Sequence, residues 1–273
     1  MDSIICKLEK PIFSLELVEG KVINRPSKQI KSPYLADVLV NGETVLCHTP
    51  SLGCCGLVSS EKKVLMKKKD SKNAKSKYSI DFAYDNKTIV GVNPLYANKI
   101  VEICLKNNYI PELKDLENVK REYSINQSRL DFYGEKNKKK YYIEVKNVPL
   151  ADYVDVDKKE RKNYNNDNYK YNEKISYFPD GYRKKKTDTI SERALKHINH
   201  LKELKLEDSN NECFLIFIIQ RNDSIYFQAS NIDPIYQNAI KEAYIAGVKI
   251  LPIQIEIKNN TLYYGRKLIL NII

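Results

Sequence analysis

The chain has 273 residues, of which 42% are hydrophobic and 30% charged. That is enough apolar surface for a substantial core, at a length where chains often divide into domains. Lys and Arg number 46 against 35 Asp and Glu, a formal net charge of +11, which favours an anionic partner and above all nucleic acid. The lysine can equally serve as solubilising surface, because a bias toward Lys, Asn, Ile and Tyr runs along the whole chain.

The first ten residues, MDSIICKLEK, carry early charges and no long apolar run, which argues against a secretory signal or a membrane anchor. The six cysteines are scattered without a paired CxxC spacing, as is usual in reducing compartments. We therefore expect a soluble, intracellular protein of the cytoplasm.

Residues 13–92 contain short stretches typical of β-strands, such as YLADVLV and ETVLCH. Asn41-Gly42 joins these two stretches, and this dipeptide is a strong signal of a β-hairpin. Five or six short strands that close on themselves predict a small β-barrel of the oligonucleotide-binding (OB) type. The periodicity alone would also permit another small β-fold.

The second part of the chain alternates between helix and strand patterns. Apolar residues at helical spacing predict a helix over residues 98–106, and two strands follow near residues 123–132 and 141–148. Thr189-Ile-Ser-Glu192 has the form of a capping box, so a long amphipathic helix should begin there and run to about Leu206.

Residues 213–220, CFLIFIIQ, are an unbroken apolar run, which predicts a central strand covered on both faces. Asp233-Pro234 is a good helix start and Gly247 a good stop. The strand that follows contains Pro252, which favours a sheet edge or a bulge. These patterns predict a mixed sheet flanked by helices, and an α+β protein overall.

Residues 158–187 are predicted to be a basic insertion in this second domain. Its first part, KKERKNYNNDNYKYNEKISY, has Ile175 as its one aliphatic residue, so it cannot bury enough apolar surface to offset the entropy of ordering. We expect residues 158–177 to be disordered, either contacting nucleic acid through lysines and tyrosines or simply solvated.

An acid and a base stand in the middle of the strand expected at residues 141–148. Side chains alternate along a strand, so Glu144 and Lys146 share one face, and Asp131 closes the preceding strand. Two carboxylates suit Mg²⁺ or Mn²⁺, and a lysine on the same face can stabilise phosphorane charge or help to deprotonate water. This D…ExK arrangement predicts phosphodiester hydrolysis with Asp131 and Glu144 as metal ligands. The alternative is a cross-strand salt bridge on an exposed sheet face.

The motif is followed by an amphipathic helix and an apolar strand, which is the order of the restriction-endonuclease-like core, PD-(D/E)xK. The chain also resembles the sugar fermentation stimulation protein A (SfsA) family over most of its length. The resemblance is carried, in this order, by VGVNPLYANKIVEICL, SRLDF, YYIEVKNVPL, YFPD, SERALKHINHLKEL, FIIQRND and NIDPIYQNAIKEAYIAGV.

This resemblance implies an OB-type barrel at residues 1–93, a nuclease-like domain at residues 94–273, and DNA binding with little sequence preference. It also implies that Glu102 belongs to the acidic site with Asp131, Glu144 and Lys146, which together would be its catalytic residues.

The chain departs from the family at residues 48–53, which read HTPSLG in place of HCPNTG. A longer stretch between YFPD and SERALKH leaves the position of Asp180 relative to the metal open. His48 and His197 are expected to be a packed loop histidine and a helix-face histidine rather than catalysts.

Two functions are consistent with the sequence. One is a Mg²⁺- or Mn²⁺-dependent, nuclease-like enzyme that binds DNA. The other is a non-catalytic DNA-binding or transcription-regulatory module that retains the acidic site.

Overall fold

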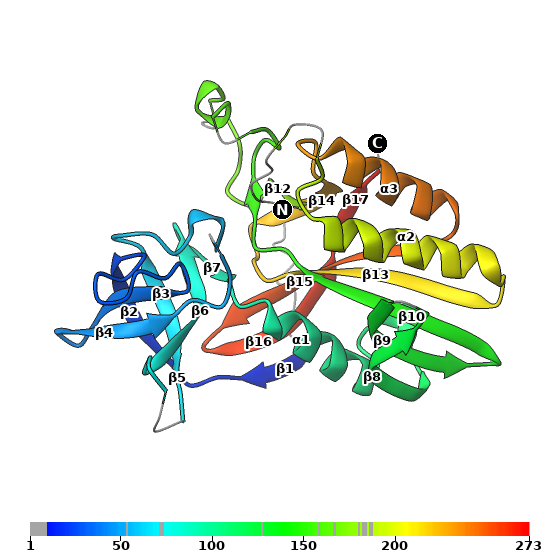
Figure 1. Cartoon of the computed structure of the whole chain (residues 1–273), viewed down its shortest axis with the longest axis horizontal. Coiled ribbons are helices and arrows are strands. Elements are labelled where there is room, and N and C mark those ends of the chain that lie inside the picture. Colours follow the sequence, from blue (N-terminus) through cyan, green and yellow to red (C-terminus); the bar gives the residue numbers. More distant parts are fainter. Residues whose placement is uncertain are drawn as a thin grey trace, which may run out of the picture.

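The structure is a computed structural model that describes residues 10–52, 54–70, 74–126, 128–157, 159–165, 168–179, 181, 185 and 188–272. Figure 1 shows a small β-barrel beside a larger unit in which helices cover a sheet. Of the helices that these residues form, none has the length and apolar character needed to cross a membrane.

The barrel is formed by short antiparallel strands with apolar side chains turned inward. They are β2 (Leu17–Asn24), β3 (Leu35–Val40), β4 (Glu43–His48), β5 (Lys63–Lys68), β6 (Tyr78–Asp85) and β7 (Thr88–Gly91), with a 3₁₀ turn at Cys54–Gly56. The strand order is β4-β3-β2-β5-β6-β7, and a parallel pairing of β4 with β6 closes five strands into a ring. Asn41 and Gly42, with φ of 49° and 85°, form the turn between β3 and β4, so the predicted hairpin is confirmed.

The larger unit is built on a mixed seven-stranded sheet. In spatial order its strands are β1 (Pro11–Ser14), β16 (Thr261–Lys267), β15 (Lys249–Lys258), β13 (Asn211–Ile219), β10 (Lys139–Asn147), β9 (Ser128–Lys136) and β8 (Glu117–Ile125). A second sheet of four strands contains β11 (Ala151–Asp152), β12 (Lys174–Phe178), β14 (Ser224–Ala229) and β17 (Ile269–Asn271). The α+β fold with an N-terminal barrel is therefore as predicted.

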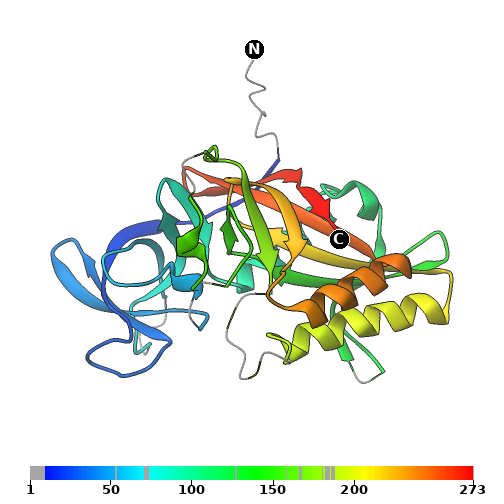
Figure 2. The same ribbon diagram turned by 90° about the horizontal axis from the view of Figure 1, so that it is seen from above.

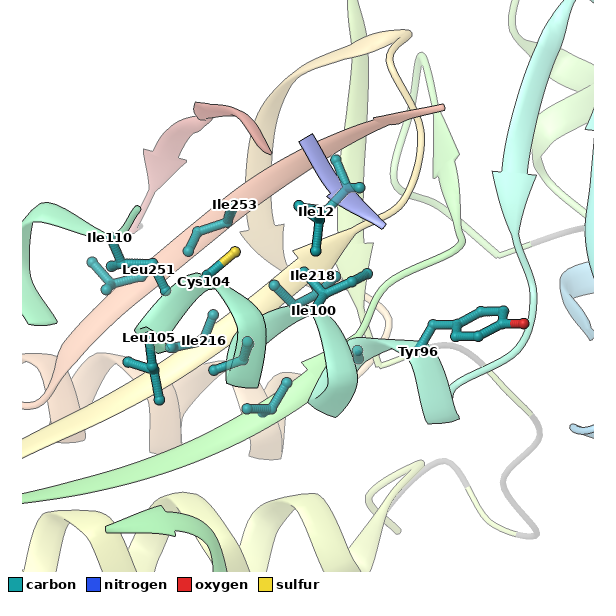
Figure 3. Close-up of a cluster of buried hydrophobic side chains, with 14 of the residues drawn as sticks. Ile12, Tyr96, Ile100, Cys104, Leu105, Ile110, Ile216, Ile218, Leu251 and Ile253 are labelled. Atoms are coloured by element: carbon teal, nitrogen blue, oxygen red, sulfur yellow. The ribbon is translucent and has the colours of Figure 1, made fainter. Parts of the chain in front are cut away.

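Helices lie on both faces of the seven-stranded sheet. They are α1 (Leu95–Lys106), α2 (Glu192–Glu207) and α3 (Pro234–Ile245), with 3₁₀ turns at Pro111–Leu113 and Arg161–Asn163. On one face α1 packs Ile100 and Cys104 against Ile216 of β13, as Figure 3 shows. On the other face α2 and α3 lie side by side (Figures 1 and 2).

Strand β13 is central and buried on both faces, as its apolar run predicts. Phe214, Ile216 and Ile218 join the cluster under α1, whereas Leu215 and Phe217 join the cluster under α2 and α3. Each fully buried side chain of this kind contributes about 1.5–3 kcal/mol. This strand therefore ties together the two layers that hold the site.

The predicted ends of α2 and α3 agree with the structure to within two residues, but one of the two predicted N-caps is a different residue. Asp233 caps α3 by accepting from the Tyr236 amide, as expected, and Gly247 follows the helix with φ of 100°. The N-cap of α2 is Ser191, which accepts from the Ala194 amide, and not Thr189 of the predicted capping box. The Thr189 hydroxyl instead donates to Asp233 at 2.8 Å.

Three strand predictions are corrected by long-range pairing. Residues 123–132 are not one strand, because β8 and β9 form a hairpin across them. Pro252 lies on β15, which is paired on both sides, and only the irregular register between Ile253 and Ile255 matches the expected bulge. The barrel is predicted to include residues 1–93, but Pro11–Ser14 form β1, which pairs with β16 of the larger sheet.

The prediction of a disordered segment at residues 158–177 is wrong for its C-terminal part. Lys174–Phe178 form β12, in which Lys174, Ser176 and Tyr177 are buried. The ring of Tyr169 also stacks on Tyr153, with centroids 5.0 Å apart. In the last part of the predicted insertion, residues 180, 182–184, 186 and 187 lie outside the described residues.

A buried ion network joins the barrel to the larger unit. The guanidinium of Arg221, 1% exposed, donates to Asp223 at 2.6 and 2.7 Å and to Asp85 of β6 at 2.7 Å. Lys174 lies 3.1 Å from Asp85 and 2.9 Å from Asp223. Burial opposes ionisation, but Arg221 and Lys174 outweigh it and lower the pKa of both carboxyl groups.

We predict that Arg221→Met lowers the free energy of unfolding by about 3–5 kcal/mol, because it leaves the buried carboxylate of Asp223 and the half-buried carboxylate of Asp85 with one cation between them. The control is Arg129→Met, since Arg129 is 61% exposed and pairs with an equally exposed Glu122; it should cost at most about 1 kcal/mol. Urea unfolding at neutral pH measures both values.

A comparison of wild type with Arg221→Met at different pH values also tests the network. Asp85 and Asp223 have folded-state pKa values below the ordinary 3.8, so their contribution is present above that pH and is lost as the pH falls through the folded values. The difference in the free energy of unfolding between wild type and Arg221→Met should therefore become smaller in acid. A difference that stayed constant down to full acid unfolding would contradict this account.

Candidate functional site

Asp131 lies where β9 and β10 separate. The two strands pair as far as Phe132 and Ile143, and beyond that point the Asp131 carboxylate accepts the Val145 amide at 2.8 Å. Its other oxygen accepts from the Asn98 amide of α1 at 2.7 Å. Burial, together with the neighbouring charge of Glu144, raises the pKa of Asp131.

Glu144 is in the interior of β10 and is 2% exposed. One of its oxygens, Oε1, contacts both the Lys146 ammonium and Nδ1 of His197, which reaches it from α2. The Lys146 and His197 nitrogens are 3.3 Å apart. Burial opposes the charge of Glu144, but the His197 hydrogen bond and the Lys146 ammonium lower its pKa. The two carboxylates of the site are therefore pushed in opposite directions.

The second oxygen of Glu144, Oε2, is buried and has no hydrogen-bond partner among the described residues. An unsatisfied buried carboxylate oxygen is costly unless a ligand meets it. The described residues hold no cluster of three or more His, Cys, Asp or Glu side chains that would enclose a metal. The chain thus offers two carboxylates, which fits a cation such as Mg²⁺ that keeps several of its waters.

Of the four residues predicted for the site, Asp131, Glu144 and Lys146 line one cleft, whereas Glu102 is not among the residues that line it. Glu102 pairs with Lys106 at 2.8 Å and with Arg121 at 2.7 Å. The residue of α1 that touches Asp131 is Asn98, one helical turn earlier. Asp180, whose position the sequence leaves open, lies outside the described residues.

The three assembled residues line a cleft of about 450 Å³. Basic side chains from three elements also line it, Arg121 of β8, Lys146 of β10 and Arg193 of α2. A cleft with two carboxylates and three cations can hold a divalent ion together with the phosphates that the ion would bind.

Asn98 and Arg121 are parts of the site that the sequence analysis did not name, and His197 is one that it expected to be a helix-face histidine without a role in the site. The sequence signal that could have indicated His197 is its spacing of four from Arg193. This spacing puts the two polar residues on one face of the helix, next to the buried Ala194 and Ile198. His197 is thus a partner of Glu144 and Lys146, and not merely a helix-face residue. His48 of β4 is a barrel residue and does not line the cleft.

A family model described as the sugar fermentation stimulation protein RE domain (SfsA) matches residues 95–158 and 162–261. The chain belongs to the SfsA family. It is 29% identical over 259 residues to a sugar fermentation stimulation protein homolog of Pelagibacter ubique, covering 94% of this chain and 97% of that protein. A homolog from Desulfotalea psychrophila is 28% identical over 248 residues, covering 89% of each.

A solved structure of SfsA from Pyrococcus furiosus, in complex with Ca²⁺, superposes with a TM-score of 0.75. It is 18% identical and covers 96% of this chain and 99% of that one. At this identity the likeness establishes the shared fold. The predicted membership of the SfsA family, together with its barrel and mixed-sheet architecture, is therefore confirmed.

We predict that Asp131→Asn stabilises the protein at neutral pH in the presence of EDTA. The folded-state pKa of Asp131 is above its ordinary 3.8, so its favourable contribution is full in acid and is lost as the pH rises through the folded value. The asparagine side chain removes that cost, and its oxygen can still accept the Val145 N–H. Its NH₂ group can donate to the Asn98 side chain once that amide turns its oxygen toward it. Thermal unfolding measures the effect, with exposed Asp70→Asn as the control. A lower midpoint for Asp131→Asn would contradict the prediction.

Proposed function

We propose that this SfsA-family protein binds nucleic acid, DNA in particular, and that Asp131 and Glu144 hold a divalent cation at a site built for phosphodiester hydrolysis. The observation that carries the proposal is the unpartnered Oε2 of Glu144, a buried carboxylate oxygen in a cleft that Arg121 and Arg193 also line. The Ca²⁺ in the Pyrococcus furiosus SfsA structure supports a divalent ion, and we propose Mg²⁺ or Mn²⁺ here.

A cation bound there would lower the pKa of a water molecule that it holds and would neutralise negative charge on the phosphate. The protein's own groups have separate tasks. Lys146 keeps Glu144 ionised and lies where it can approach a phosphate oxygen, while Arg121 and Arg193 hold neighbouring phosphates. His197, when protonated on Nδ1, donates to Glu144 and leaves Nε2 as an acceptor for a proton.

A second candidate is a DNA-binding module that does not hydrolyse its ligand. It is favoured by the contact of both Lys146 and His197 with the same Glu144 oxygen, because groups engaged with that oxygen are not free to act on water or phosphate. Incubation of the pure protein with single-stranded DNA, duplex DNA and RNA, with Mg²⁺, Mn²⁺ or EDTA, separates the two candidates.

The first test of nucleic-acid binding is its salt dependence. We expect log affinity to fall linearly with log salt, with a slope of about −0.9 for each phosphate neutralised on duplex DNA. Arg193→Ala should reduce that slope by about 1, because Arg193 is an exposed cation at the cleft. The matched control is Lys258→Ala, at the turn between β15 and β16. An affinity that does not change with salt would refute phosphate-based binding.

The second test concerns the metal. Calorimetry with Mg²⁺ or Mn²⁺ should show binding to wild type and to Lys146→Ala but not to the Asp131→Asn, Glu144→Gln double variant. The metal should also raise the unfolding midpoint of wild type, by an amount that grows with its concentration relative to the dissociation constant. Lys146→Ala should abolish any cleavage, and DNA binding should survive in every variant. Equal metal binding by wild type and the double variant would leave a salt bridge as the explanation of the motif.

A further inference from the structure

A second cavity adjoins the acidic cleft, at the junction of the barrel and the larger unit. It also has a volume of about 450 Å³, and it is lined by residues 51, 52 and 54–56 of a barrel loop, by the chain that follows β10, and by Ile232. Pro94 and Asn147 line both hollows. The cleft and this interdomain cavity are therefore neighbours that share one wall.

The two hollows differ in chemistry. The acidic cleft contains three cationic side chains, whereas the interdomain cavity is walled mainly by apolar groups such as Leu52, Val92 and Leu150. Its one cation, among the described residues that line it, is Arg161, which donates to the Val156 carbonyl at 3.2 Å and lies 3.7 Å from Asp152. The cavity is therefore poorly suited to a phosphate, and an apolar hollow with a few polar groups suits a planar base.

Asn147 stands at the boundary between the two hollows with its amide orientation fixed. The side-chain NH₂ group of Gln220 donates to Oδ1 of Asn147 at 2.7 Å. The side-chain NH₂ group of Asn147 is therefore the part left to donate to a ligand. Gln220 is itself held against the barrel, because the Gly91 amide donates to its carbonyl at 2.9 Å. A Cβ at Gly91 would come within 2.5 Å of the Gln220 side chain. Contact between the two units thus presets this donor.

Two leucines stand exposed beside the paired hollows. Leu52 is 62% exposed and lines the interdomain cavity, and Leu95 is 75% exposed and lines the acidic cleft. Apolar side chains in such places can separate stacked bases. Cationic side chains, an amide donor, an apolar hollow and exposed leucines therefore occur around two hollows that share Pro94 and Asn147.

We infer that the interdomain cavity binds an unstacked nucleobase of the strand whose phosphate lies in the acidic cleft, so that the preferred ligand is single-stranded or carries an unpaired nucleotide. This inference rests on the proposed binding of nucleic acid. It adds the class of ligand, the Asn147 amide as a specificity contact, and a role for the junction of the two units.

The experiment uses the full chain and a single-stranded DNA oligonucleotide that contains 2-aminopurine, a base whose fluorescence rises when it leaves a stack. None of the described residues that line the cavity is aromatic, so a base that enters it loses its stacking partners. We expect fluorescence to rise on binding in EDTA, and affinity for the single strand to exceed that for a blunt duplex by about tenfold or more at equal salt.

Two variants test the location. Ile232→Glu should place a carboxylate inside the cavity, and Leu52→Asp should oppose an apolar base at its mouth. Each should lower single-strand affinity by about tenfold and suppress the fluorescence rise, while duplex affinity falls by a much smaller factor, because the added charge repels the phosphates of either ligand. The matched control is Leu206→Asp on α2, where an equally exposed leucine, at 68%, is changed in the same way. Leu52 is on the surface, so that variant remains informative if Ile232→Glu fails to fold.

The outcomes separate this inference from the proposed function. Salt-dependent binding without a preference for single strands, or with a preference that both variants retain, overturns the base-binding cavity and leaves nucleic-acid binding intact. No binding of any nucleic acid by wild type overturns both. A fluorescence rise that Leu206→Asp also suppresses would assign the effect to the general surface and overturn the proposed location.

Discussion

The buried guanidinium of Arg221 is the interaction on which the arrangement of the two units depends. It contacts Asp85 of the barrel, Asp223 beside it in the chain, and the carbonyl of Pro149 at 2.8 Å. Pro149 is two residues beyond Asn147, the last residue of the strand that carries Glu144 and Lys146. One desolvated cation therefore sets both the position of the barrel and the path of the chain as it leaves the site. Such a network adds little stability over an apolar core, but losing one member is costly, so it restricts the ways in which the two units can pack.

The acidic site shows a similar balance of opposing charges. A salt bridge on an exposed sheet face was the alternative explanation of D…ExK, and the Lys146–Glu144 ion pair does exist, yet Glu144 is 2% exposed beneath α2. A pair placed there for surface solubility would not need burial. The raised pKa of Asp131 and the lowered pKa of Glu144 show that the site carries one carboxylate charge comfortably and a second at a cost. A divalent cation would remove that cost, which is a physical reason for two carboxylates to remain so close.

The sequence predicts the features whose causes are local. The Asn41-Gly42 turn, the cap at Asp233 and the burial of residues 213–220 each follow from a short stretch of chain. What it could not predict depends on partners distant in sequence. Residues 174–177 look like part of a solvated loop because Ile175 is the one aliphatic residue of residues 158–177. The acids that allow Lys174 to be buried, Asp85 and Asp223, lie 89 and 49 positions away from it. Likewise Asn98 and His197 join the site only because α1 and α2 pack on opposite faces of one sheet. Motif spacing gives Asp131, Glu144 and Lys146 but says nothing about which helical residues complete them.

The catalytic and non-catalytic candidates differ by one rearrangement of side chains. Lys146 and His197 both contact Oε1 of Glu144, whereas Oε2 is the oxygen without a partner. A cation that reached Oε2 would therefore not need to displace either group, and metal binding alone would not distinguish an enzyme from a binding module. Hydrolysis requires more, because Lys146 or His197 must turn from Glu144 toward the phosphate or the attacking water. A cation at Oε2 would withdraw charge from Glu144 and so weaken its hold on both groups, and a phosphate anion in the cleft would compete for them. Metal and nucleic acid together would then supply the change that neither supplies alone.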